Sequence, residues 1–197
     1  MSNNYYLHFK NAKTKIDVAF FERIARWLVK KGFKYLSFWS AGDEIPISFD
    51  YAIRKLPEGG RISFKVGEND VSLDYFNEIA LVTHPVNFEK NNFFTDLFIE
   101  AMVYLYLELK ADKAYGVIID YTSTDEEESA RHFEHYVSCF NIFNPEIAEK
   151  ISREKLVQVN AYKAEYLKDG SLLLVLSENP RNVSGEKMEN VRRQLFG

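Results

Sequence analysis

The chain has few of the residues that build covalent or metal-bound frameworks. It has one cysteine among 197 residues, Cys139, which excludes an internal disulfide and a zinc site built from several cysteines. Its 9 glycines and 5 prolines are scattered. No Gly-x-Gly-x-x-Gly, phosphate-loop or Gly-x-Ser-x-Gly pattern occurs, so the usual nucleotide-binding and serine-hydrolase signatures are missing. We recognise no protein family in these residues.

Long apolar runs are also lacking. The most apolar stretch, residues 93–109, contains Asp96, Glu100 and Glu108, which favours a buried helix over a membrane span. The first ten residues hold no apolar run long enough for a signal peptide. We therefore expect a soluble, cytoplasmic protein that does not contact a membrane.

A strong positive charge is missing as well. The net charge is −4, so we do not expect nucleic acid as a partner. The charge is unevenly divided: residues 1–65 carry +6, residues 66–137 carry −11 and residues 138–197 carry +1. Arg23, Arg26 and Lys30 form one stripe of a predicted helix. It is either a patch for phosphate or an acidic partner, or a solvated helix face, and we favour the solvated face.

Aromatic and apolar residues, in contrast, are plentiful, at 15% and 46% of the chain. Their periodicity predicts strands over residues 4–9, 33–39, 62–66, 71–75, 79–83, 115–121, 156–166 and 172–176. It predicts helices over residues 17–32, 48–56, 92–109, 125–140, 145–154 and 184–195. Hairpins alternate with strand–helix–strand units, which indicates an α+β fold with a mixed, mostly antiparallel sheet and helices packed against it. We expect a single domain over residues 1–197, with a boundary near residue 88 as the alternative.

One constellation could carry chemistry. On a helix over residues 125–140, Glu128, His132, His135 and Cys139 fall within an arc of about 60°. Carboxylate, imidazole and thiolate groups can bind zinc, and a histidine can activate a thiol. These four are the candidate catalytic residues. His132, His135 and Asp120 are the candidate metal ligands, although the sequence identifies no cofactor. Alternatively, the histidines are solvated and Cys139 packs in the interior.

Two further alternatives concern the aromatic strand and the function. Trp39 precedes the acidic residues of a loop over 40–44. It either lines a pocket or belongs to the core, and we favour the core.

The sequence favours a non-catalytic domain that binds another protein, as an inhibitor, immunity or adaptor domain does, or that binds a second copy of itself. The alternative is a metal- or thiol-dependent hydrolase that uses the Glu128–Cys139 stripe, so whether the protein is an enzyme stays open.

Overall fold

The computed structural model describes residues 4–40, 43–84, 87–88, 92–119 and 135–197. Its strands are β1 (Asn4–Lys10), β2 (Lys34–Ser40), β3 (Asp43–Ile45), β4 (Gly60–Val66), β5 (Asn69–Tyr75), β6 (Ile79–Thr83), β7 (Lys113–Ile119), β8 (Phe140–Phe143), β9 (Lys163–Tyr166) and β10 (Leu172–Val175). Its α-helices are α1 (Val18–Lys30), α2 (Phe49–Lys55), α3 (Asn92–Leu109), α5 (Pro145–Glu149), α6 (Arg153–Gln158) and α7 (Gly185–Phe196). The predicted α+β class is confirmed.

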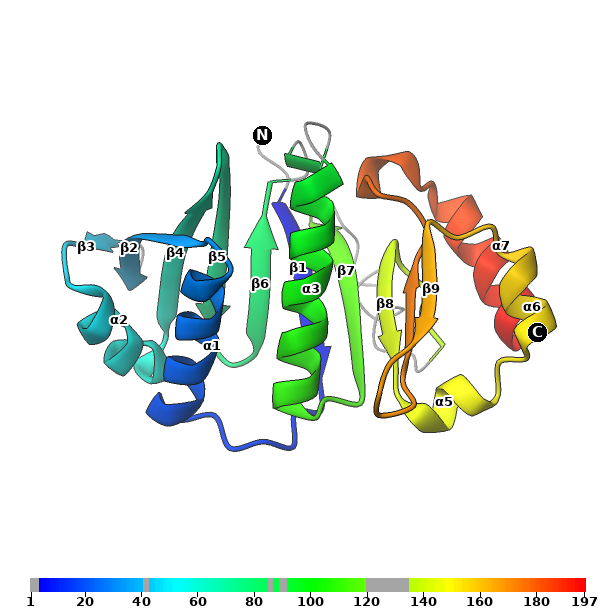
Figure 1. The fold of residues 1–197 in the computed structure, drawn as a ribbon, viewed down its shortest axis with the longest axis horizontal. Helices are drawn as coiled ribbons and strands as arrows, with labels where there is room; N and C mark the ends of the chain where they lie inside the picture. Colours follow the sequence, from blue (N-terminus) through cyan, green and yellow to red (C-terminus); the bar gives the residue numbers. More distant parts are fainter. Residues whose placement is uncertain (1–3, 41–42, 85–86, 89–91, 120–134) are drawn as a thin grey trace.

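The ten described strands form one sheet in the order β3-β2-β4-β5-β6-β1-β7-β8-β10-β9 (Figure 1). Every described pairing is antiparallel, so the expected parallel component is not found in this part of the chain. Strand β1 lies in the middle. Leu7 stands opposite Leu81 of β6 on one side and Gly116 of β7 on the other, so the sheet continues across residue 88.

The helices begin where short polar side chains can accept the first free backbone N–H groups. Asp17 accepts from the N–H of Phe20 at 3.0 Å, and Ser48 and Ser184 cap α2 and α7 in the same way. Such caps replace hydrogen bonds that the first turn cannot make within the helix. The starts of these helices agree with the sequence predictions because capping is a local property.

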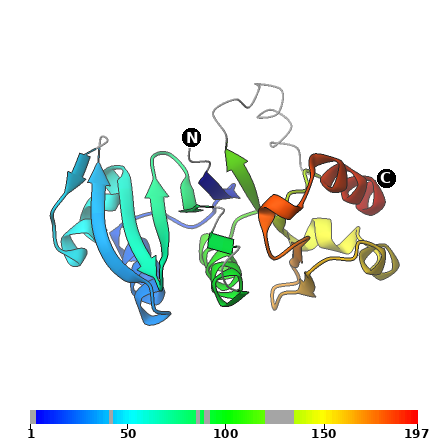
Figure 2. The same ribbon diagram turned by 90° about the horizontal axis from the view of Figure 1, so that it is seen from above.

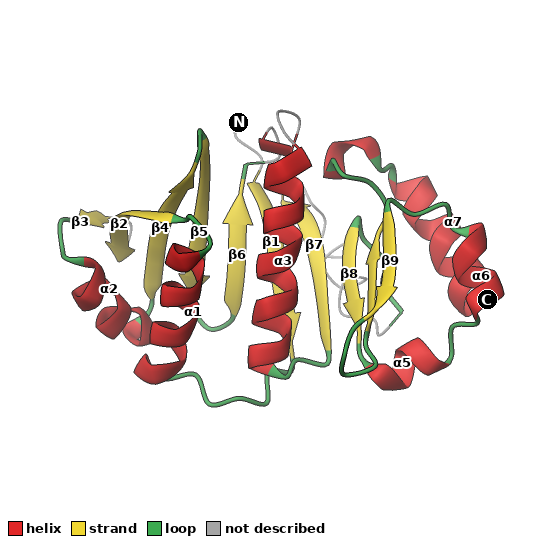
Figure 3. Ribbon diagram, viewed as in Figure 1, coloured by secondary structure: helices red, strands yellow, loops and turns green. Residues whose placement is uncertain are grey.

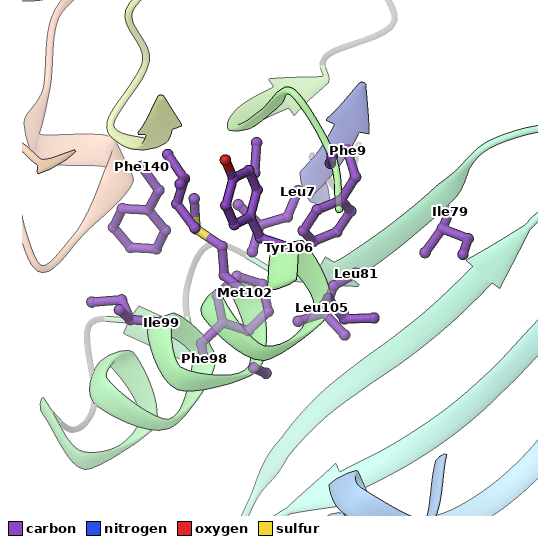
Figure 4. Packing of buried hydrophobic residues seen from close by; sticks show 14 of the residues in the cluster. Leu7, Phe9, Ile79, Leu81, Phe98, Ile99, Met102, Leu105, Tyr106 and Phe140 are labelled. Atoms are coloured by element: carbon purple, nitrogen blue, oxygen red, sulfur yellow. The ribbon is translucent and has the colours of Figure 1, made fainter. Parts of the chain in front are cut away.

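Helices α1, α2 and α3 lie on one face of the sheet (Figures 2 and 3). At the other end of the sheet, β8 is covered on both faces. Phe140 of β8 lies 6.4 Å from Phe98 of α3, between ring centroids, and Phe143 lies 5.7 Å from Phe196 of α7. Helix α3 therefore sits over the centre of the core. Figure 4 shows its side chains against β1, β6 and β8, with Phe98, Ile99, Met102, Leu105, Tyr106, Leu7, Phe9, Leu81 and Phe140 among them.

A close contact between β1 and β7 occurs at Gly116. The phenol of Tyr5 lies directly over Gly116, and a Cβ atom added at Gly116 would stand 1.7 Å from the Tyr5 Oη. The Tyr5 hydroxyl is buried and has no hydrogen-bond partner among the described residues. Ser138 closes the neighbouring gap, since its Oγ accepts from the Gly116 N–H at 3.1 Å and donates to the Phe140 carbonyl at 2.7 Å. Position 116 thus requires glycine for steric reasons.

Four predicted elements are wrong in part. The expected helix over 145–154 is two helices, α5 and α6, with a break at residues 150–152. Residues 43–45, expected in a loop, form β3. The expected strand over 156–166 begins instead as helix α6, and only Lys163–Tyr166 is extended. The expected helix over 125–140 does not reach its end, because residues 135–139 are irregular and β8 begins at Phe140. Among the described residues, no helix is long and apolar enough to cross a membrane.

Candidate functional site

Cys139 lies in the interior and is not an accessible thiol. It is 4% exposed, and its Sγ donates to the carbonyl of Ser177, just after β10, at 3.3 Å. Burial disfavours the thiolate and raises the pKa of Cys139 to about 12. Catalytic thiols have a lowered pKa and an open approach, so this environment is the opposite of an activating one.

His135 does not share a helical stripe with Cys139. The backbone between them is not helical, and the imidazole stacks on Phe196 of α7, with ring centroids 4.4 Å apart and planes 13° apart. The predicted stripe fails here because β8 pairs with both β7 and β10. Those ladders hold Phe140 and Asn141 in extended backbone.

The other candidate residues, Asp120, Glu128 and His132, lie outside the described residues. The proposed metal ligands His132, His135 and Asp120 therefore stay a prediction. Within the described ranges, no group of three or more His, Cys, Asp or Glu side chains is arranged to hold a metal ion.

The basic stripe of α1 is largely neutralised within the molecule. Arg23 pairs with Glu108 of α3 at 3.3 Å, and Arg26 pairs with Glu22 at 2.9 Å and with Asp50 of α2 at 3.2 Å. These side chains are about half exposed, so each pair contributes little to stability. The pairs nevertheless neutralise the positive charge of Arg23 and Arg26, which a phosphate or an acidic partner would need for binding. This arrangement agrees with the preferred interpretation of a solvated helix face.

A different surface stands out on the face of the sheet opposite α1 and α2. We call it the open sheet face and define it by Lys34, Ser37 and Trp39 of β2 and by Arg61, Ser63 and Lys65 of β4. The register aligns Trp39 with Arg61, Ser37 with Ser63 and Lys34 with Lys65. Alternate residues of the same strands, among them Phe38, Ile62 and Phe64, point to the helices and are buried. Among the described helices, none lies over the open sheet face (Figure 2).

Trp39 belongs to this face and not to the core. It is 37% exposed, and its Nε1 donates to the Ser37 Oγ at 3.1 Å, which orients the indole along the strand. The preferred interpretation of Trp39 as a core residue is therefore wrong, and its neighbour Phe38 fills that role at 2% exposure. The acidic residues Asp43 and Glu44 belong to the edge strand β3, paired with β2.

The charges on the open sheet face are of two kinds. Arg61 makes a two-pronged ion pair with Asp74 of β5, with an Nε–Oδ1 distance of 2.9 Å and an Nη2–Oδ2 distance of 2.6 Å. Its guanidinium is thereby fixed in place. Lys34 and Lys65 stand directly opposite each other, and like charges in that arrangement destabilise a sheet. On its other side Lys65 stands opposite Asp70 of β5, so Lys34 is the cation of this face that has no acidic residue opposite it in the described ladders.

The sequence alone predicts part of the open sheet face. The alternation from residue 60 to 66 identifies Arg61, Ser63 and Lys65 as the polar side of a strand. It does not tell which strands flank β4 or that this side lacks a helix, because both depend on the order of strands in the sheet.

The described residues thus define an α+β protein built on one long antiparallel sheet. No protein-family model matches the sequence, and no curated protein matches it. Among solved structures, the chain is similar to the Pseudomonas aeruginosa T6SS protein PA0821, with a TM-score of 0.50 and 11% identity over 98% of this chain and 72% of that chain. At this identity the likeness shows a shared fold, and a fold alone does not assign a function.

Proposed function

We propose that the protein is a non-catalytic domain that binds an acidic surface of another protein through the open sheet face. Tryptophan and arginine dominate the binding energy of many interfaces, and Trp39 and Arg61 stand side by side on this face. Arg61 is already oriented by Asp74, so less conformational freedom is lost when a partner docks.

The paired lysines supply the observation that carries the proposal. Lys34 stands opposite Lys65 across β2 and β4, where like charges repel, and Lys65 has Asp70 of β5 on its other side. A carboxylate from a partner would relieve that repulsion. Arg23 and Arg26 of α1 are already paired with acidic residues, as Arg61 is. Lys34 faces only Lys65 in the described ladders, so the open sheet face is the better site for an acidic partner.

The environment of Cys139 supports a non-catalytic function. A thiol-dependent hydrolase needs a thiolate that a substrate can reach, and this thiol is buried with its pKa raised to about 12. The resemblance in fold to a T6SS protein adds no residue to the argument, since it extends to the fold alone.

The proposal is tested by capturing partners from a lysate of the source cells with wild-type protein and with surface variants, followed by mass spectrometry. A protein with an acidic surface should bind wild type and lose affinity for Trp39→Ala by about thirtyfold, the effect of losing roughly 2 kcal/mol at a hot spot. Arg153→Glu, an exposed charge reversal on α6 at the other end of the molecule, serves as the control and should bind normally.

Lys34→Glu separates binding from folding. It places opposite charges across β2 and β4, which should stabilise the free protein by about 0.2–1 kcal/mol while weakening the complex. A partner that binds Lys34→Glu and Trp39→Ala as tightly as wild type would refute the proposed surface.

A further inference from the structure

Strand β9 forms one end of the sheet and leaves its outer edge open. It pairs with β10 on one side, and the order of the described strands places nothing on the other. Ala164, Glu165 and Tyr166 are exposed. An open edge presents backbone donors and acceptors that another strand can pair with.

The pattern of hydrogen bonds shows which groups of β9 point outward. The N–H of Leu167 donates to the carbonyl of Ser171 at 2.7 Å, so residue 167 points toward β10. Residues alternate along an antiparallel pair, so Lys163 and Glu165 also direct their backbone groups inward. The N–H and C=O of Ala164 therefore point to the open edge.

We infer that β9 pairs antiparallel with β9 of a second copy of this chain, about a two-fold axis at Ala164, so that the two sheets join into one. Ala164 then exchanges both backbone hydrogen bonds with the partner's Ala164. Shifting the register by one residue would set outward groups against inward ones, so neighbouring registers are excluded by the backbone alone.

The charges of β9 fit this arrangement. Lys163 and Glu165 lie on one face of the strand, with their Nζ and Oε1 atoms 3.4 Å apart. About an axis at Ala164, Lys163 stands opposite the partner's Glu165, and Glu165 opposite the partner's Lys163. Each contact is made twice, and directly opposed unlike charges stabilise a strand pair.

Pairing of β9 with β9 of a second copy fits the charges of this edge better than pairing of β9 with the edge strand β3 of another copy. The edge strand β3 carries Asp43 and Glu44 and no cation, so it offers no partner for Glu165. The small side chain of Ala164 also lets two strands approach at the axis. A closed two-fold dimer is the result, whereas β3 against β9 would give an open chain of molecules.

This inference is independent of the proposed function. Strand β9 lies at the opposite end of the sheet from β2, so the dimer leaves the open sheet face uncovered. A failure to dimerise would not affect the proposed partner, and a missing partner would not affect the dimer.

The test uses sedimentation velocity over a concentration series reaching about 100 μM, the range in which small interfaces associate. Wild type should form a dimer. Lys163→Glu and Glu165→Lys each oppose like charges twice, so each should weaken the dimer by about tenfold or more. The double variant Lys163→Glu/Glu165→Lys restores unlike pairs and should dimerise as wild type does. An equimolar mixture of the two single variants should form a mixed dimer.

Two further variants complete the test. Ala164→Pro removes an outward N–H that makes no bond to β10, so it should abolish the dimer while circular dichroism shows an intact fold. Glu68→Lys, the same charge change in the exposed turn after β4, should leave the dimer unchanged. The inference is overturned if wild type stays monomeric, if it forms larger open assemblies, or if single and double charge variants associate equally.

Discussion

Replacing Gly116 with alanine should destabilise the protein through one contact. The new Cβ would stand 1.7 Å from the Oη, 2.2 Å from the Cζ and 2.8 Å from the Cε1 of Tyr5. The phenol must therefore leave its place, and it is 1% exposed among Phe88, Phe98 and Phe140. Overpacking a core costs about 1–3 kcal/mol, and removing a buried aromatic ring altogether about 3–5 kcal/mol.

We expect Gly116→Ala to lose about 3 kcal/mol of unfolding free energy, or about 6–12 °C in melting temperature for a chain of this length. Urea denaturation followed by circular dichroism measures it. Gly185→Ala is the matched control, because a Cβ at Gly185 meets nothing within 4 Å and alanine favours the helix there. Tyr5→Phe removes only the unpartnered hydroxyl and should be neutral or stabilising. A Gly116→Ala protein within about 0.5 kcal/mol of wild type, the usual range for an inconsequential substitution, would refute the packing described.

The remaining predictions concern the candidate site predicted from the sequence. Cys139 should resist thiol reagents at pH 8 in the folded protein and react on unfolding. Its pKa rises from 9.0 to about 12 on folding, so the stability it contributes is full below pH 9 and is lost between about pH 9 and 12. Unfolding measured at pH 8 and 10.5 should therefore show a smaller loss for Cys139→Ala than for wild type. If the protein is not a metal-dependent hydrolase, as we propose, elemental analysis should find no stoichiometric transition metal. His135→Ala and His132→Ala should then take up added zinc as wild type does. A bound metal that disappears in either variant would instead favour the hydrolase.

Local signals predicted much of the fold. The caps at Asp17, Ser48 and Ser184 and the turn at Gly170, where φ is +88°, depend on a few neighbouring residues and agree with the structure. Helix α6 was missed although its signal is also local. Ser152 caps it by accepting from the Lys155 N–H at 3.2 Å, while the apolar alternation that follows suggested a strand.

Elements fixed by distant partners could not be predicted in this way. Residues up to Phe140 have helical periodicity, yet β8 is held by ladders to β7 and β10, and Asn141 bonds to the carbonyl of Leu174 at 3.3 Å. The same limit applies to the candidate site. The sequence places Cys139 near histidines, but its burial depends on the loop after β10, whose Ser177 carbonyl accepts from the thiol.

The central place of β1 has a consequence for synthesis. Strand β1 is synthesised before both of its partner strands, and one of them, β7, lies about 100 residues later. At roughly 5–20 residues per second, β1 waits on the order of ten seconds with one edge unpaired. Such distant pairing also slows folding, since a long loop must close before the contact is made. A nascent chain stalled before residue 113 should therefore expose the edge of β1 that pairs with β7, and chaperones that bind extended apolar segments should engage the protein there.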